Sequence, residues 1–261
     1  MSGRLSRRIV VVTGAGRGLG RAIALGMARE GATVWICART KPELEETASR
    51  IRKEGGVVEV RTVDLVDAGA CSDFISNVLM VAGRVDVLVN NAAVLDLLPI
   101  DQLDQKLWDQ TLAINLTAPF VLSKSVLPSM LTTGGSIINV SSRAGAAGFA
   151  NEAAYCSSKF GLEGFTRALA VELSECGISI NTITPGLKIK PTSVTDIQAA
   201  ERSSDEQKIW NDPIQLVPAF VWLSCLRGEV NGQRFDAQVL SRALGAEGFD
   251  ISPDRAMQLA E

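Results

Sequence analysis

Residues 13–20 have the sequence Thr13-Gly14-Ala15-Gly16-Arg17-Gly18-Leu19-Gly20, and they follow directly on the apolar run from Ile9 to Val12. A helix-like stretch continues from these glycines to about Glu30. Glycines allow the backbone to turn tightly here and to approach a pyrophosphate, whose charge then lies at the N-terminus of the helix. A glycine turn on its own is often only a turn. Its position directly after the first predicted strand favours a dinucleotide-binding loop.

The rest of the chain repeats this order of a short buried strand and an apolar-periodic helix. The predicted strands are Ile9 to Val12, Thr33 to Cys37, Val57 to Val60, Val85 to Val89, Ser136 to Val140 and Ile178 to Ile183. These runs are too apolar to have a solvated face, so helices should cover both sides of a parallel sheet. The prediction is an α/β protein with a doubly wound parallel sheet, the Rossmann fold, in three α/β/α layers. We expect a single domain over residues 1–261, with a substrate lid at about 187–210 and a variable C-terminal tail at about 237–261.

The composition excludes several classes of enzyme. The 261 residues include no histidine, so a Ser-His-Asp triad, a Cys-His pair and a His-ligated metal site are all ruled out. The net charge of −3 suggests neither a nucleic acid nor an anionic membrane as a partner. The first apolar run is too short for a membrane span. Five scattered cysteines without a C-x-x-C pair favour a reducing compartment, and we expect a cytoplasmic protein.

Proton transfer must then depend on tyrosine, lysine, cysteine or a carboxylate. Tyr155 is the only tyrosine, and Lys159 lies four residues after it, so the two side chains share one helix face. A nearby ammonium favours the phenolate, and we therefore expect Lys159 to lower the pKa of Tyr155. The same spacing also occurs by chance on many solvated helices, so the pair needs support from the rest of the sequence.

That support comes from a set of six motifs in order along the chain. They are Thr13-Gly14-x-x-x-Gly18-x-Gly20, Asn90-Asn91-Ala92-Ala93, Asn115, Ser142, Tyr155-x-x-x-Lys159 and Pro185-Gly186. Over roughly residues 8 to 236, this set resembles the short-chain dehydrogenase/reductase family, and its general resemblance is nearest to the 3-oxoacyl-carrier-protein reductases. The resemblance implies an NAD(P)-dependent oxidoreductase that transfers hydride between nicotinamide and a ketone or secondary alcohol. No metal is expected.

The resemblance also implies four catalytic residues. Tyr155 would act as general acid or base on the substrate oxygen, and Ser142 would hold that oxygen. Lys159 would bond the nicotinamide ribose, and Asn115 would order a water that connects Lys159 to solvent. Taken singly, Ser142 and Asn115 are each more often a helix cap or a satisfied core residue.

The cofactor is expected to contact residues from all parts of the cleft. The implied cofactor-binding residues are Gly14, Gly16, Arg17, Gly18, Leu19, Gly20, Arg39, Asp64, Leu65, Asn91, Ala92, Tyr155, Lys159, Pro185 and Gly186. Two departures from the family pattern stand out: Ala93 replaces a glycine, and Lys190 stands where many members have a threonine. We assign Lys190 no role, and Thr192 is an alternative if the loop shifts.

Two arginines bear on the choice of cofactor. The second predicted strand is followed closely by Arg39, and its end lacks the carboxylate that bonds the ribose hydroxyl of NAD. Arg17 offers a second guanidinium, and a planar fork suits the 2′-phosphate of NADP. We therefore predict that NADP(H) is preferred over NAD(H), with ordinary exposed arginines as the alternative interpretation. Asp64 matches the family position at the adenine ring.

The substrate pocket is predicted to be mainly apolar, with Leu95, Ala144, Phe149 and Leu187 among its walls. Lys188 and Lys190 could attract an anionic group, although lid lysines are usually solvated. The helices near 107–130 and 153–175 are unusually apolar for surface helices, and we expect a homo-oligomer, either a dimer or a tetramer.

Two other functions are compatible with such a fold. One is a sensor or scaffold that binds the cofactor without turnover, which would predict damage at the catalytic positions, and none is present. The other is an epimerase or dehydratase acting on a nucleotide sugar, whose relatives usually carry a longer C-terminal substrate region.

Overall fold

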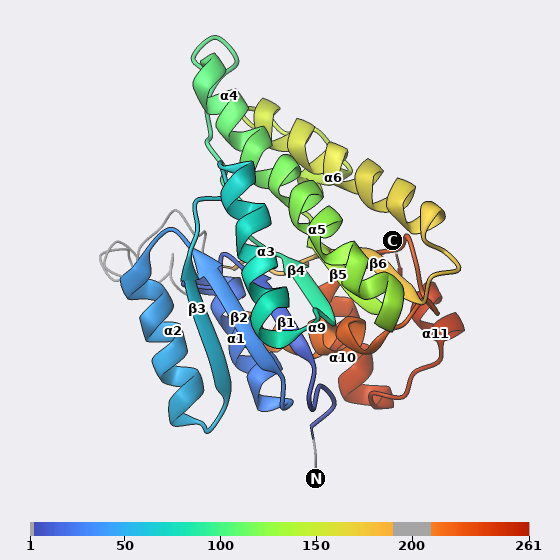
Figure 1. Ribbon diagram of the computed structural model, residues 1–261. Helices are drawn as coiled ribbons and strands as arrows, with labels where there is room; N and C mark the ends of the chain where they lie inside the picture. Colours follow the sequence, from blue (N-terminus) through green and yellow to red (C-terminus); the bar gives the residue numbers. More distant parts are fainter. Residues whose placement is uncertain (1–2, 190–209, 261) are drawn as a thin grey trace.

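The computed structural model describes residues 3–189 and 210–260, in which parallel strands form one sheet between two layers of helices (Figure 1). The strand order is β3-β2-β1-β4-β5-β6-β7. The strands are β1 Ile9–Thr13, β2 Thr33–Ala38, β3 Val57–Thr62, β4 Val87–Asn90, β5 Gly135–Val140, β6 Ile178–Thr184 and β7 Arg234–Asp236. The fold class is therefore the predicted doubly wound α/β sheet in a single domain.

The α-helices connect these strands. They are α1 Gly18–Arg29, α2 Lys41–Lys53, α3 Ala68–Ala82, α4 Gln105–Leu112, α5 Ala118–Thr133, α6 Ala153–Glu172, α9 Val217–Cys225, α10 Ala237–Glu247 and α11 Pro253–Gln258. Shorter helical turns are the π-helix η1 Ala113–Thr117 and the 3₁₀ turns η2 Arg143–Gly145 and η3 Pro213–Leu216. In Figure 1, α4 and the first turns of α6 extend beyond the sheet.

The strand order changes direction between β1 and β4. From β1 the chain builds outward through β2 to β3, and it then crosses back to place β4 on the other side of β1. Val12 is paired with Ile36 on one side and with Val89 on the other. At such a switch point the connections leave in opposite directions and open a crevice at the carboxyl ends of the strands. The expected ligand site therefore lies above β1 and β4.

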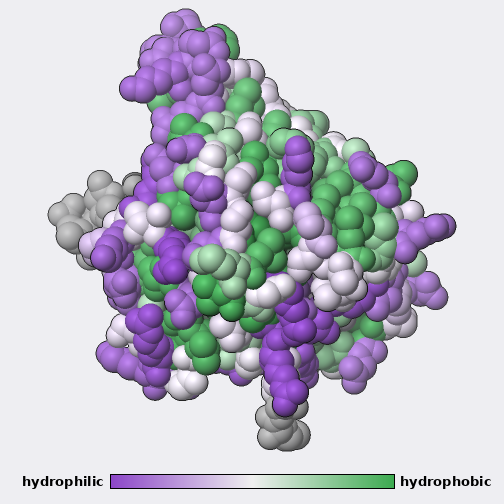
Figure 2. Space-filling model, viewed as in Figure 1, coloured by the Kyte–Doolittle hydropathy of each residue, from purple (hydrophilic) through white to green (hydrophobic). Residues whose placement is uncertain are grey.

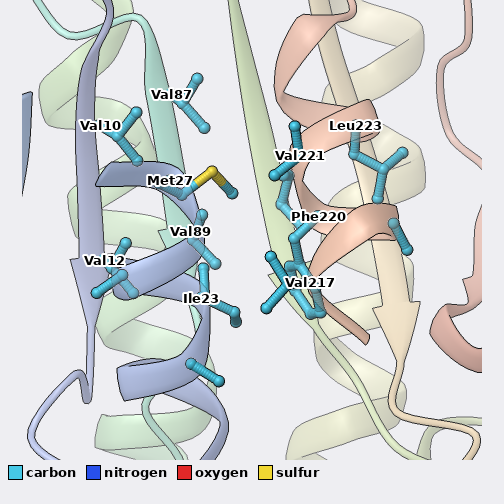
Figure 3. Packing of buried hydrophobic residues seen from close by; sticks show 14 of the residues in the cluster. Val10, Val12, Ile23, Met27, Val87, Val89, Val217, Phe220, Val221 and Leu223 are labelled. Atoms are coloured by element: carbon cyan, nitrogen blue, oxygen red, sulfur yellow. The ribbon is translucent and has the colours of Figure 1, made fainter. Parts of the chain in front are cut away.

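Alternation of side chains along β1 divides the core into two layers. Val10 and Val12 belong to the cluster formed with α1 and α9, whereas Val11 belongs to the cluster on the opposite face. Figure 3 shows Ile23 and Met27 of α1 near β1 and β4, together with the labelled side chains of α9. The two helices approach closely, because a Cβ atom on Gly26 would lie 2.1 Å from a methyl carbon of Val217. Both faces of the central strands are buried, which fixes the strand ends that carry the site.

The structure differs from the prediction in three places. β4 begins at Val87 rather than Val85, and β7 was missed because three residues give no periodic signal. The tail is folded: α10 packs Leu240 and Leu244 into the core, and Ala260 forms a bridge with Phe235 of β7. Most of the predicted lid, residues 190–209, lies outside the described residues.

None of the helices in the described ranges is long and apolar enough to cross a bilayer.

Candidate active site

A cleft of about 1100 Å³ runs across the carboxyl ends of the sheet. It begins at the glycine loop after β1 and ends beside the segments that follow β5 and β6. Most of the predicted cofactor residues line it: Gly14, Gly16, Arg17, Leu19, Arg39, Asp64, Leu65, Asn91, Ala92, Tyr155, Lys159, Pro185 and Gly186. Residues from widely separated motifs therefore meet in one cavity, as the crevice of a doubly wound sheet requires.

The glycine loop is shaped for close approach of a charged group. Gly14 and Gly18 have positive φ angles of 65° and 55°. Gly20 does not line the cleft; it packs beneath the loop, where an added Cβ would lie 2.3 Å from the Gly14 carbonyl oxygen. The start of α1 has no side-chain cap and no acidic residue in its first turn. Its N–H groups and positive dipole end are thus available to a phosphate, and the loop fits a dinucleotide.

Two side chains hold the carbonyl groups of this loop. The guanidinium of Arg21 donates to the Gly16 carbonyl from Nε at 3.0 Å and also from Nη2. Thr47 on α2 donates from Oγ1 to the Ala15 carbonyl at 2.9 Å. Neither residue was predicted from the sequence, although an arginine one turn into the helix after the glycine loop was a possible signal. These bonds fix the conformation of the glycine loop.

The end of β4 is joined to the same loop. Thr13 Oγ1 accepts from the backbone N–H groups of Asn91 and Ala92 at 3.0 and 3.1 Å. The Asn91 side chain donates from Nδ2 to the Thr13 carbonyl at 2.8 Å. Ala93, which stands in place of the family glycine, lines the cleft beside them. The Asn90 to Ala93 motif therefore has a structural task in addition to the predicted contact with the cofactor ribose.

Charges at the end of the cleft near α2, where the adenosine is expected, are partly neutralised. Arg17 forms an ion pair with Glu43 on α2, with 3.0 Å between Nη1 and Oε1. Arg39 is exposed at the edge of the cleft. Asp64 lines this end, and its Oδ1 accepts from the Val66 N–H at 3.2 Å. Glu43, which was not predicted from the sequence, also lines this end and holds the Arg17 guanidinium.

Asn115 is buried in the π-helix η1, where α4 passes into α5. Its amide forms two bonds with the backbone of Val94, each 2.9 Å long, and Nδ2 also donates to Ser158 Oγ at 3.1 Å. The side chain therefore ties the segment after β4 to α6 and does not line the cleft itself. A π-bulge at a functional site is a frequent arrangement.

Lys159 is buried beneath the cleft with only 2% of its surface exposed. Its Nζ donates to the Val140 carbonyl oxygen at the end of β5 at 2.8 Å. Burial lowers the pKa of the ammonium to about 8, and the nearby Glu163 carboxylate opposes that change. At neutral pH most of the molecules therefore keep Lys159 charged.

Tyr155 lies one turn before Lys159 on α6, with Nζ 5.7 Å from its ring centroid. Burial raises the pKa of the phenol, and this outweighs the hydrogen bond with Ser142, which lowers it. The expected net lowering by Lys159 is therefore wrong for this structure, because desolvation of the phenolate dominates. A phenol that stays neutral in a cleft is suited to donate a proton.

Ser142 follows β5 and begins the turn η2. Its Oγ accepts from the Ala144 N–H at 3.2 Å and hydrogen-bonds with the phenol of Tyr155. Ser142, Tyr155 and Lys159 all line the same part of the cleft. The site can thus present two hydroxyl groups to one oxygen atom, with a cation close behind them.

The remaining predicted residues have three different outcomes. Leu95, Phe149 and Leu187 line the substrate end, together with Pro185, Gly186 and Lys188. Ala144 does not line the cleft and is buried within η2, which corrects its prediction as a pocket wall. Lys190 and Thr192 lie outside the described residues. Arg143, Arg234 and Asp236 also line the cleft and were missed.

The chain is similar to known proteins over most of its length. The family model described as short chain dehydrogenase matches residues 8–204. A D-threitol dehydrogenase of Mycolicibacterium smegmatis is 36% identical over 183 residues, covering 70% of each chain. A metagenomic short-chain oxidoreductase solved with NADP is 38% identical, with a TM-score of 0.69, over 76% of this chain and 90% of the other. An actinorhodin polyketide ketoreductase variant solved with NADPH is 29% identical, with a TM-score of 0.79, over 90% and 97%.

The depressed pKa of Lys159 leads to a prediction about stability. Because the unfolded chain binds this proton more tightly, the buried ammonium destabilises the fold below about pH 8, and the penalty fades as the pH rises toward the ordinary lysine value. Lys159→Met should therefore raise the melting temperature at neutral pH, and the gain should shrink above about pH 8. At about 1.4 kcal/mol per pKa unit, the gain in the free energy of unfolding is a few kcal/mol at most. Loss of the hydrogen bond to Val140 reduces this gain.

The measurement is thermal unfolding of both proteins across a pH series, with the exposed Lys53→Met as the control. A Lys159→Met protein that is less stable than the parent at every pH would contradict the stated penalty.

Proposed function

The chain belongs to the short-chain dehydrogenase family and is an NAD(P)-dependent oxidoreductase acting on CH–OH or C=O groups, and we propose that it interconverts a ketone and a secondary alcohol with NADP(H), using Tyr155 as the general acid or base. One observation supports this most: Ser142, Tyr155 and Lys159 line the same cleft as the uncapped start of α1. Bound NADPH supplies the hydride, and the protein supplies position and protons.

The protein's own residues would manage the proton and the substrate oxygen. In reduction, the neutral phenol of Tyr155 donates its proton to the carbonyl oxygen while the Ser142 hydroxyl holds that oxygen in place. The charged Lys159 stabilises the phenolate that remains and binds the ribose hydroxyls of the cofactor. Asn115 holds η1 against α6 and orders the water through which the proton returns. The reverse sequence serves oxidation.

NADP(H) as the preferred cofactor is supported by two arginines and by relatives solved with NADP or NADPH. Arg39 is exposed at the adenosine end, where it can meet a 2′-phosphate. Arg17 is held by Glu43 and must leave that ion pair, at least in part, to contribute. We infer that Glu43 weakens the preference for NADP(H) over NAD(H).

The substrate end combines apolar walls with cations. Leu95, Phe149 and Leu187 supply the apolar surface, and the Arg143 guanidinium stacks 4.8 Å from the Phe149 ring centroid. Lys188 also lines this end. A screen should therefore include apolar ketones and oxo acids, along with sugar alcohols of the kind named for the Mycolicibacterium relative.

The proposed homo-oligomer would form through α5 and α6. Phe120, Leu131, Phe160 and Val171 on these helices are exposed, and Phe120 packs edge-on against Phe165 across the two helices with 6.1 Å between ring centroids. Figure 2 shows hydrophobic surface over this part of the molecule. A dimer would cover these side chains. We also propose a cytoplasmic location, which the five free cysteines support.

Tyr155→Phe tests the proposed acid. The substitution keeps the ring and removes the proton, so kcat for carbonyl reduction should fall by about a hundredfold or more, while NADPH still binds. Turnover is followed by NADPH absorbance and binding by cofactor fluorescence. The neighbouring Cys156→Ala serves as control and should keep parental kcat. Parental turnover in Tyr155→Phe would refute the assigned acid; a parent without turnover on any substrate, but with tight NADPH binding, would favour the sensor or scaffold.

Opposite substitutions at the adenosine end test the cofactor. Arg39→Asp should weaken NADPH and shift the preference toward NADH, by roughly tenfold to a hundredfold for one charge-assisted phosphate contact. Glu43→Gln should instead strengthen NADPH, because it releases Arg17. Dissociation constants for both cofactors give the answer, with Lys53→Asp on α2 as control. Equal affinities of the parent for NADPH and NADH would rule out the proposed preference.

Phe160→Glu tests the oligomer, since a carboxylate on the exposed apolar face of α6 opposes its burial. The mass in solution, measured by light scattering, should fall to that of one chain. Met80→Glu on α3, an apolar position outside α5 and α6 that is even more exposed than Phe160, should leave the mass unchanged. A parent that is already monomeric would end the proposal.

A further inference from the structure

A buried ion pair lies directly below the proposed catalytic residues. Glu163 on α6 contacts Arg234 on β7, and their side chains are only 5% and 7% exposed. The second carboxylate oxygen of Glu163 accepts from Thr182 Oγ1 on β6 at 2.9 Å. The pair therefore connects the helix that carries Tyr155 and Lys159 with the far edge of the sheet.

Arg234 extends this connection to Ser142. Its Nη2 donates to the Ser142 carbonyl oxygen at 3.0 Å, and its Nη1 is 3.3 Å from Ser141 Oγ. The packing is tight, because a Cβ on Gly145 would lie 2.7 Å from Ser141 Oγ and 3.1 Å from Cγ of Glu163. The backbone of Ser142 is thus fixed relative to α6 by the guanidinium.

Glu163 also acts on Lys159, which lies one turn earlier on the same inner face of α6. Its negative charge favours the ammonium and opposes the desolvation that lowers the pKa of Lys159. Arg234 neutralises part of that charge. The balance between the two partners therefore sets how firmly Lys159 keeps its proton.

Stability alone gives little reason for such a pair. Desolvation of two charges commonly cancels their attraction, and well-packed apolar residues in their place are often neutral or stabilising. The bonds to Ser142 and the charge near Lys159 supply another reason.

We propose that Glu163 and Arg234 are a positioning pair for this reaction, in which Arg234 holds the Ser142 backbone in register with Tyr155 and Glu163 keeps Lys159 charged. This rests on the proposed function. Neither residue exchanges a proton with the substrate; both act through the residues that do. The pair's role should show as altered titration of Lys159 and Tyr155 and as a loss in kcat at nearly constant KM.

Other ionisable groups near Lys159 lie on the elements packed around it. The variants used in the test must leave these groups in place. Glu152, just before α6, and Cys156 on α6 lie near Tyr155, and α4 carries Lys106 and Asp109, which are exposed. The other charged groups that line the cleft near this end are Arg143 after β5, Lys188 after β6 and Asp236 of β7.

The first experiment follows Lys159 directly, by NMR of protein labelled at the lysine Cε, with the Lys159 signal identified by its absence in Lys159→Met. Glu163→Gln removes a negative charge and should lower the pKa of Lys159. Arg234→Gln leaves the carboxylate unopposed and should raise it. Opposite shifts in two folded variants support the charge role, since general disruption would not produce them. An unchanged pKa in Glu163→Gln would overturn it.

The second experiment uses the single tyrosine of the chain. Near-ultraviolet absorbance of tyrosinate titrates Tyr155 alone, within the pH range where circular dichroism shows a native fold. Arg234→Gln should raise the pKa of Tyr155 above the parental value, because Ser142 loses its support and its bond to the phenol weakens. The exposed pair Glu247–Arg255 provides the control, and Glu247→Gln should change nothing. No shift in Arg234→Gln would contradict the positioning of Ser142.

The third experiment separates positioning from folding. Each single variant should lower kcat by up to about a hundredfold with KM nearly unchanged, and Glu163→Asp should recover part of the loss. The double variant Glu163→Leu/Arg234→Met should regain thermal stability yet keep a low kcat. If kcat returns with stability, the pair is structural only. Neither titration needs turnover. A parent that is inactive on every carbonyl would therefore count against the proposed function, and the two titrations would still test the roles of Glu163 and Arg234.

Discussion

The bond from the Lys159 ammonium to the Val140 carbonyl is the contact on which the arrangement of the site depends. Val140 is the last residue of β5, and Ser142 follows two residues later. The bond therefore fixes the position of α6 along its axis relative to the end of β5, which Ser142 follows. Because parallel strands present their carboxyl ends on one edge, this contact also aligns Tyr155 with the glycine loop after β1. Without it, the catalytic helix would lose a direct bond to the strand end that precedes Ser142.

The inner face of α6 continues this polar contact instead of becoming purely apolar. Lys159, Glu163 and Thr166 follow at helical spacing, and Thr166 accepts from the Asn139 amide at 2.8 Å. Asn139 in turn accepts from Asn90 at the end of β4. Apart from Asn90 Oδ1, which has no hydrogen-bond partner among the described residues, these buried groups are paired, so the helix is placed by directional bonds as well as by packing. Directional bonds fix rotation and register more precisely than apolar contact does.

The sequence predicted those features that are local in the chain. The glycine loop, the six long strands and the Tyr155–Lys159 spacing are each carried by a few neighbouring residues, and the structure places them as expected. Glu163 and Arg234 are 71 residues apart, and Arg17 and Glu43 are 26 apart, so no periodicity joins either pair. The predicted lowering of the Tyr155 pKa was wrong for a related reason. The spacing predicts a nearby cation, whereas the burial of the ring, which raises the pKa, depends on the folded β5–α6 region. Distance along the chain, more than chemical type, separates what was predicted from what was missed.

Burial explains why the two titrating groups move in opposite directions. Desolvation penalises whichever form is charged, so it raises the pKa of the Tyr155 phenol and lowers that of the Lys159 ammonium. With a Lys159 pKa of about 8, the pair still holds both protons at neutral pH. A site in this state is ready to give a proton and is poorly prepared to take one. Charge from neighbouring residues, of which Glu163 is the buried example, then decides how far the ammonium resists the low-dielectric surroundings that keep the phenol neutral.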